Sequence, residues 1–189
     1  MRFFISLLLM ISFYSLAEDD HHSHDHGHDH TNKERSKKEK KSLDAHVHCV
    51  SVLNLVQDMN QLSFEFGMPG FDVVGFEYKA KKKEDIKKVR NALSILGSYK
   101  NMFNVPASAN CKEEKNSAQV INEGSHSEFI SQYLLSCEKI SSIKSIEIKY
   151  FDSFQFSKEL NINLIAKNKK MTKTLNKLDN IINVDGYFN

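Results

Sequence analysis

The stretch that decides the fold is residues 45–66, which carry the sequence AHVHCVSVLNLVQDMNQLSFEF. Its first half is rich in β-branched and apolar residues, which predicts a largely buried strand over residues 45–56. Residues 57–60 supply turn chemistry, and Leu62, Phe64 and Phe66 then alternate with polar side chains. Alternation with a period of two is typical of a strand with one buried face. We therefore expect a β-hairpin here.

The rest of the chain predicts more strands than helices. Helical spacing of apolar residues predicts one helix over residues 81–96, carried by Ile86, Val89, Leu93 and Leu96. Strands are expected over residues 108–120, 126–137, 145–150, 160–165, 171–175 and 181–184, with an apolar connection at 71–76. Apolar residues between 171 and 182 also fit a helix, so that segment is open. The predicted fold class is α+β, mostly antiparallel sheet with one main helix.

The start of the chain predicts a targeting segment. A basic Met1-Arg2 precedes the almost wholly apolar residues 3–16, and Ser15 and Ala17 place small residues where a signal peptidase cleaves. The alternative is a membrane anchor, but residues 3–16 fall short of the ~20 residues that a spanning helix needs. We expect a signal peptide at 1–17, export without stable membrane insertion, an arm at 18–42 and one domain at 43–189.

The charge balance argues against a nucleic-acid partner. Lys and Arg number 26 against 24 Asp and Glu, a formal net charge of +2, whereas a nucleic-acid-binding domain is clearly basic. The lysine-rich residues 32–41 predict a disordered, solvated linker, with contact to anionic lipid headgroups or cell-wall polymer as the alternative. The lysines of the expected helix are interpreted as its solvent-facing side, with a membrane or nucleic-acid role as the minor alternative.

A histidine tract lies at the start of the arm. Residues 21–30, HHSHDHGHDH, contain His21, His22, His24, His26, His28 and His30. Neutral imidazole is a common ligand for zinc, copper and nickel, and the tract has no hydrocarbon from which to build a core. The tract predicts binding of Zn²⁺, with Cu²⁺ or Ni²⁺ as alternatives because imidazole alone does not select zinc. The other interpretation is a solvated acidic linker.

A second candidate site lies in the predicted domain. His46 and His48 are two residues apart, which places both side chains on one face of a strand, and His126 and Glu128 repeat the arrangement. If the two strands are neighbours, four donors of types that zinc accepts converge. The alternative is that each histidine is an ordinary surface residue. Cys49 is expected on the opposite face, as a small buried side chain.

Export would permit a disulfide between two of the three cysteines. The sequence alone leaves the pairing open. Because Cys111 and Cys137 each lie beside a strand-like segment, we expect these two to pair.

A series of motifs follows the histidine tract: residues 45–48 (AHVH), 68–77 (MPGFDVVGFE), Cys111, 126–129 (HSEF) and 133–137 (YLLSC). In this order they resemble the ZrgA-type zinc-uptake proteins, a periplasmic bacterial family. The resemblance implies an α/β sandwich, zinc binding and support of zinc import beside an ABC transporter, and it agrees with the Cys111–Cys137 pair. Cys49 and Tyr78 depart from the family, which usually has glycine and often histidine there.

These observations favour a periplasmic zinc-binding accessory or carrier protein, with zinc ions and a zinc ABC transporter or its binding protein as partners. A protein that buffers copper or nickel is the alternative. A metal-dependent enzyme is a third hypothesis, but the sequence has no H-E-x-x-H helix and no nucleophile elbow, so no enzymatic activity is expected.

Overall fold

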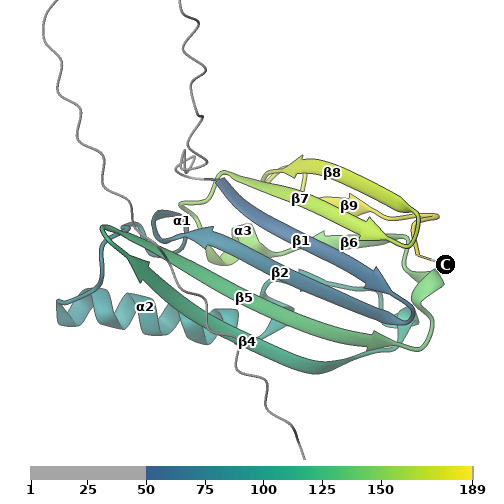
Figure 1. Ribbon diagram of the computed structural model, residues 1–189, viewed down its shortest axis with the longest axis horizontal. Helices are drawn as coiled ribbons and strands as arrows, with labels where there is room; N and C mark the ends of the chain where they lie inside the picture. Colours follow the sequence, from purple (N-terminus) through teal and green to yellow (C-terminus); the bar gives the residue numbers. More distant parts are fainter. Residues whose placement is uncertain (1–49, 189) are drawn as a thin grey trace, which may run out of the picture. The chain divides into compact units, whose positions relative to one another are not determined.

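The computed structural model describes residues 50–188, in which nine strands form two sheets (Figure 1). The larger sheet has six strands in the order β4-β5-β2-β1-β7-β8. Their bounds are β1 Val50–Asp58, β2 Gln61–Pro69, β4 Cys111–Glu123, β5 His126–Cys137, β7 Glu159–Ala166 and β8 Lys169–Leu175. Neighbouring strands are antiparallel except β1 and β7, which run parallel.

The smaller sheet and the helices complete the domain. The smaller sheet has the antiparallel order β3-β6-β9, with β3 at Phe103–Asn104, β6 at Ser145–Ile148 and β9 at Ile181–Asn183. The α-helices are α1 Gly70–Val74, α2 Lys83–Leu96 and α3 Tyr150–Ser153. Short 3₁₀ segments lie at Tyr99–Asn101, Ala107–Ala109 and Ile140–Ser142. Among residues 50–188, no helix has the length and apolar character that crossing a membrane requires.

The predicted hairpin is confirmed for the residues that the structure describes. β1 pairs with β2 in a register that places Leu55 opposite Phe64, and the chain turns at Met59 and Asn60. The strand predicted over 126–137 has the same bounds as β5, and the predicted helix is α2. The signal peptide, the arm, His46, His48 and Cys49 lie outside the described residues, so the predictions for them stay predictions.

The predicted α+β class needs a correction in its proportion of helix to strand. Antiparallel strands dominate as expected, but α1 and α3 are single turns, so the fold is β-rich rather than an even α+β mixture. The connection predicted over 71–76 overlaps α1, and the strand predicted from residue 108 begins at Cys111 because a 3₁₀ turn precedes it. The parallel β1–β7 pair and the smaller sheet were not predicted.

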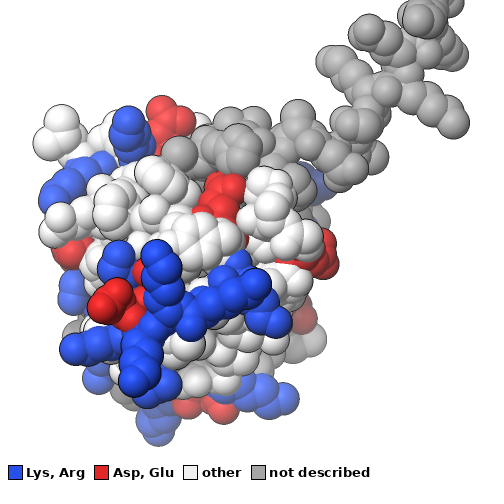
Figure 2. Space-filling view, turned by 90° about the vertical axis from the view of Figure 1, so that its left-hand side faces the viewer, with Lys and Arg blue, Asp and Glu red and all other residues white. Residues whose placement is uncertain are grey.

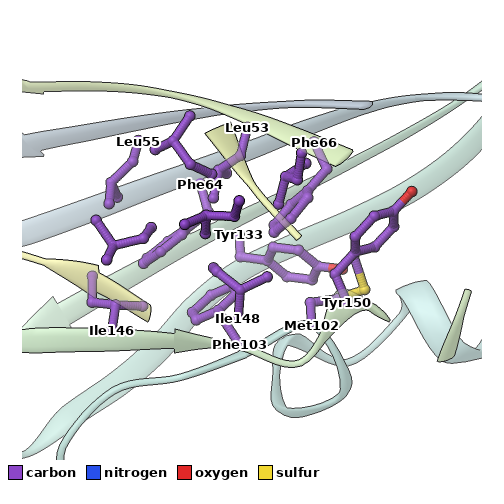
Figure 3. Close-up of a cluster of buried hydrophobic side chains, with 14 of the residues drawn as sticks. Leu53, Leu55, Phe64, Phe66, Met102, Phe103, Tyr133, Ile146, Ile148 and Tyr150 are labelled. Atoms are coloured by element: carbon purple, nitrogen blue, oxygen red, sulfur yellow. The ribbon is translucent and has the colours of Figure 1, made fainter. Parts of the chain in front are cut away.

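The core lies between one face of the six-stranded sheet and a layer made by the smaller sheet and α2 (Figure 1). Phe64 from β2 stacks on Phe103 from β3 with ring centroids 3.8 Å apart, and Leu53 and Leu55 of β1 are fully buried (Figure 3). The Tyr133 hydroxyl donates to the Leu96 carbonyl oxygen at 2.6 Å, which ties β5 to the end of α2. Each fully buried side chain of this size stabilises the fold by about 1.5–3 kcal/mol.

The other face of the six-stranded sheet is polar. Asn54, Glu65 and Gln132 lie side by side across β1, β2 and β5, and the Gln132 amide donates to the Glu65 carboxylate at 2.6 Å. Asn163 on β7 donates to the Asn54 side chain at 3.0 Å. Cross-strand pairs of this kind fix the register without burying the face. The predicted site residues on β5, His126 and Glu128, therefore project from a solvated surface.

Candidate functional site

His126 and Glu128 begin β5 and lie on the same, solvent-facing side of the sheet. The intervening Ser127 is buried, as strand alternation requires, and the side chain of His126 is 54% exposed. The Glu128 carboxylate extends over β2, where Oε1 lies 3.2 Å from the position that a Cβ on Gly67 would occupy. Gly67 thus leaves room for this carboxylate to lie flat across the neighbouring strand. Their spacing in the sequence predicted that His126 and Glu128 share a face, and the structure confirms this.

Glu77 is a member of this site that the sequence analysis missed. Its Oε2 lies 2.8 Å from Nδ1 of His126, although the two residues are far apart in the chain. A carboxylate on Nδ1 keeps the proton of a neutral imidazole on that nitrogen, which directs the ring lone pair to Nε2. This is the arrangement by which carboxylates orient metal-binding histidines in proteins. Glu77 lies in the quoted motif 68–77, but no periodicity rule brings it beside residue 126.

The strand order bears on the predicted convergence of His46 and His48 with this pair. β2 lies between β1, which His46 and His48 precede in the sequence, and β5, so β1 and β5 are not neighbours and their axes are about 9–10 Å apart. β2 ends at Pro69 opposite Glu128, and beyond that level α1 follows. Within residues 50–188, no three His, Cys, Asp or Glu side chains gather closely enough to hold a metal ion. The metal roles of His46, His48, His126 and Glu128 stay predictions.

A buried carboxylate lies behind the exposed pair. Asp72 in α1 is fully buried, and its Oδ2 accepts hydrogen bonds from Ser51 at 2.7 Å and Ser157 at 3.2 Å. The Tyr150 hydroxyl lies 2.7 Å from the Ser51 hydroxyl and is its donor, because Ser51 gives its own proton to Asp72. The network joins α1, β1 and α3, and the segment that carries Glu77 follows α1 in the sequence.

The chain was also compared with known proteins. The family model described as ZrgA family zinc uptake protein matches residues 45–184, which include β1 to β9, Asp72, Glu77, His126 and Glu128. The chain belongs to the ZrgA family. No match was found among the curated proteins.

Membership of the ZrgA family sets the functional class. The family is one of zinc uptake proteins, which implies association with zinc and an exported or envelope role, and its description names no catalysed reaction. The disulfide that the resemblance supported joins Cys111 and Cys137, which face each other on β4 and β5. The matched residues begin at 45, so the histidine tract at 21–30 lies outside them.

The buried Asp72 of this ZrgA domain should make its stability depend on pH. Burial raises the pKa of the Asp72 carboxyl above its ordinary value of 3.8, Glu77 adds to this, and the hydrogen bonds from Ser51 and Ser157 oppose it. Between 3.8 and the raised pKa, the folded chain holds a proton that the unfolded chain has released. The free energy of unfolding therefore falls as pH rises through this window.

Asp72→Asn removes the titrating group, so we expect the stability of the variant relative to the unsubstituted chain to improve as pH rises from about 4 towards neutrality. Urea unfolding at a series of pH values measures the difference. A difference that stays constant with pH would show that Asp72 does not carry this dependence.

Proposed function

We propose that this ZrgA-family chain is a periplasmic zinc-binding accessory protein that supports zinc import. It collects Zn²⁺ on the histidine arm and holds it at the end of the sheet that carries His126, from which a zinc ABC transporter or its binding protein takes it. The observation that carries the proposal is the contact between His126 and Glu77 in a domain of a zinc uptake family.

The chemistry of the end of β5 supports a zinc ligand there. With Nδ1 directed to the Glu77 carboxylate, Nε2 of His126 is the ligand nitrogen, and the carboxylate holds the ring in one orientation. Glu128, two residues on and on the same face, supplies an oxygen donor of a type that zinc accepts. His46 and His48 are proposed to complete the ligand set from the residues that precede β1.

The arm is proposed to act as a collector. Its six imidazoles, between His21 and His30, raise the local concentration of ligand, so that an ion leaving one side chain is soon bound by another. Affinity per site is modest because a segment without a core loses conformational entropy on each binding event. Coordination needs neutral imidazole, whose ordinary pKa is about 6.5, so collection weakens below about pH 6.

Zinc titration of the chain from Leu43 onward tests the folded site without the arm. We expect Glu77→Gln to weaken zinc binding by about 10–100-fold, because the amide orients the ring less strongly and adds no negative charge. His126→Ala removes the ligand itself and should weaken binding at least as much. Isothermal calorimetry, repeated with copper and nickel, measures the affinities and identifies the preferred metal.

Glu138→Gln is the matched control, since Glu138 is exposed and follows β5 at the opposite end of that strand. It should bind zinc as the unsubstituted domain does. If the domain from Leu43 binds no zinc at micromolar concentrations, the folded site is wrong. If Glu77→Gln and Glu138→Gln behave alike, Glu77 does not orient a ligand.

A further inference from the structure

One end of the domain gathers positive charge. Residues 77–90 carry seven cations against three carboxylates, and all seven cationic side chains are exposed: Lys79, Lys81, Lys82, Lys83, Lys87, Lys88 and Arg90. We call these seven residues the basic patch. Figure 2 shows Lys and Arg side chains gathered over this end of the molecule. In residues 50–188, none of the seven forms an ion pair with Asp or Glu.

Exposed aromatic rings lie directly beside the basic patch. Phe71, Tyr78 and Phe156 are 39%, 52% and 51% exposed, and they are the three aromatic residues that the described chain leaves exposed. Phe71 packs on Phe156 with centroids 5.7 Å apart, and Tyr78 stacks on Phe76 at 4.6 Å. Soluble surfaces usually scatter such side chains singly, so three rings together indicate a contact surface.

Contacts through Gly75 and Phe76 link the exposed rings to the cations. The Lys88 ammonium lies 5.8 Å from the ring centre of Phe76, next to Tyr78. The ring of Phe156 lies so close to Gly75 that a Cβ there would be 2.9 Å from its Cζ. Phe156 thus lies beside Gly75, and Lys88 lies over the neighbouring Phe76, whose own ring is buried.

The first half of α2 contributes an apolar side chain to the same surface. Ile86 belongs to the helix stripe that the sequence predicts to face the core, but it is 38% exposed, whereas Ala92 and Leu96 later in α2 are buried. The apolar stripe is therefore least buried at its start, although Val89 still packs against the core. The first half of α2 presents Ile86 among lysines, which is the composition of a helix that rests on a lipid headgroup layer.

We propose that this end of the domain docks on a bilayer surface containing anionic phospholipids. The basic patch supplies the attraction to the headgroup charges, and Phe71, Tyr78, Phe156 and Ile86 enter the interfacial layer. Lysine stems are long enough to keep the ammonium groups at the phosphates while the rings go deeper. A lipid surface matches this patch because it needs exposed cations and protruding rings, without a complementary groove.

Docking in this way would direct the His126 end of the sheet towards the membrane. Glu77, which contacts His126, is followed immediately by Tyr78 and Lys79 of the docking surface. The inference goes beyond zinc binding and does not depend on it, because it rests on charge and exposure alone. Zinc titration and lipid binding can therefore fail independently.

Co-sedimentation with vesicles tests the proposal on the chain from Glu18 onward, which lacks the apolar residues 3–16 but keeps every described residue. Binding is expected to phosphatidylethanolamine vesicles that contain phosphatidylglycerol and not to vesicles without it. The variant Lys81→Glu, Lys83→Glu, Lys87→Glu should bind about 100-fold more weakly. The matched control reverses three exposed lysines at the other end of the sheet, Lys112, Lys139 and Lys170, and should change binding by less than about threefold.

The contribution of the aromatic rings to vesicle binding is tested with variants that leave the net charge of the protein unchanged. Tyr78→Ser with Phe156→Ser should weaken vesicle binding by about 10-fold, whereas Ile165→Ser, at an exposed position on the polar face of the sheet, should leave it unchanged. Hydrogen exchange of the unsubstituted chain gives a readout that needs no variant: vesicles should protect amides within 71–90 and near 156.

Several outcomes would overturn the proposal. Equal losses in the two triple variants would mean that only total charge matters. Release by inorganic phosphate at matched ionic strength would point to a phosphate site in place of a bilayer. Binding to poly-glutamate, with no binding to the anionic vesicles, would make the patch a docking surface for an acidic protein.

Discussion

Replacing Gly70 with alanine is expected to lower the free energy of unfolding by about 3 kcal/mol or more, the upper part of the range for overpacked positions. Gly70 begins α1 where the helix passes β5, and a Cβ there would lie 2.1 Å from Oγ of Ser127. The Ser127 hydroxyl can rotate away, but the Cβ would also lie 2.7 Å from the Phe76 carbonyl oxygen and 3.0 Å from that of Ser127. Since these are backbone atoms on two sides, α1 must move away from β5.

Urea unfolding monitored by circular dichroism measures this effect, and Gly97→Ala is the matched control. Gly97 follows α2 with φ −69°, and a Cβ there would meet its nearest atoms at 3.4 and 3.5 Å, so this substitution should change stability by less than about 1 kcal/mol. Equal stability of the two variants would contradict the close approach of α1 to β5. Because Glu77 follows α1, Gly70→Ala should also weaken any zinc binding that depends on the His126–Glu77 contact.

Removing the Cys111–Cys137 disulfide is expected to cost about 3–4 kcal/mol of unfolding free energy, because the unfolded chain regains the freedom of the closed loop. The two cysteines face each other on β4 and β5 and are 26 residues apart in sequence. β4 is an edge strand with mostly exposed side chains, so little buried surface would compensate for the lost bond. The double variant Cys111→Ser, Cys137→Ser shows the cost by urea unfolding.

A reductant provides the control for this second effect. It should destabilise the unsubstituted chain to about the level of the double variant and leave the double variant itself unchanged. The bond lies at the opposite end of β5 from His126, so well below the unfolding midpoint the zinc affinity of the double variant should equal that of the unsubstituted chain. A loss of zinc affinity in the folded double variant would mean that the two ends of β5 are coupled.

Sequence patterns within a single segment predicted those strands in which buried and exposed side chains alternate. The alternation of Leu62, Phe64 and Phe66 placed β2, and the run from His126 to Cys137 gave the bounds of β5. Period-two burial acts on each strand separately, so it can be recognised without the partner strand. The partner of each strand cannot be recognised in this way. β1 pairs in parallel with β7, and only contacts between distant parts of the chain determine this.

The candidate site was likewise predictable only where it depends on spacing within one strand. His126 and Glu128 share a face because they are two residues apart on a strand, which spacing alone establishes. Glu77 reaches His126 from the segment that follows α1, which Gly70 allows to lie close to β5, and no sequence rule joins residues 77 and 126. Ile86 has core-like spacing but is exposed, because the length of a helix beyond the core depends on the size of the sheet it covers.

The parallel pairing of β1 with β7 also sets the order in which the chain can fold. Val50 pairs with Glu159 and Gln57 with Ala166, so the middle of the large sheet joins segments separated by more than half of the polypeptide. Such non-local pairing slows folding, because the entropy of closing a long loop is lost before the new contacts can compensate for it. A chain emerging from a ribosome or a translocation channel cannot complete this sheet until its last third is available. The topology thus delays completion of the large sheet until β7 and β8 have been made.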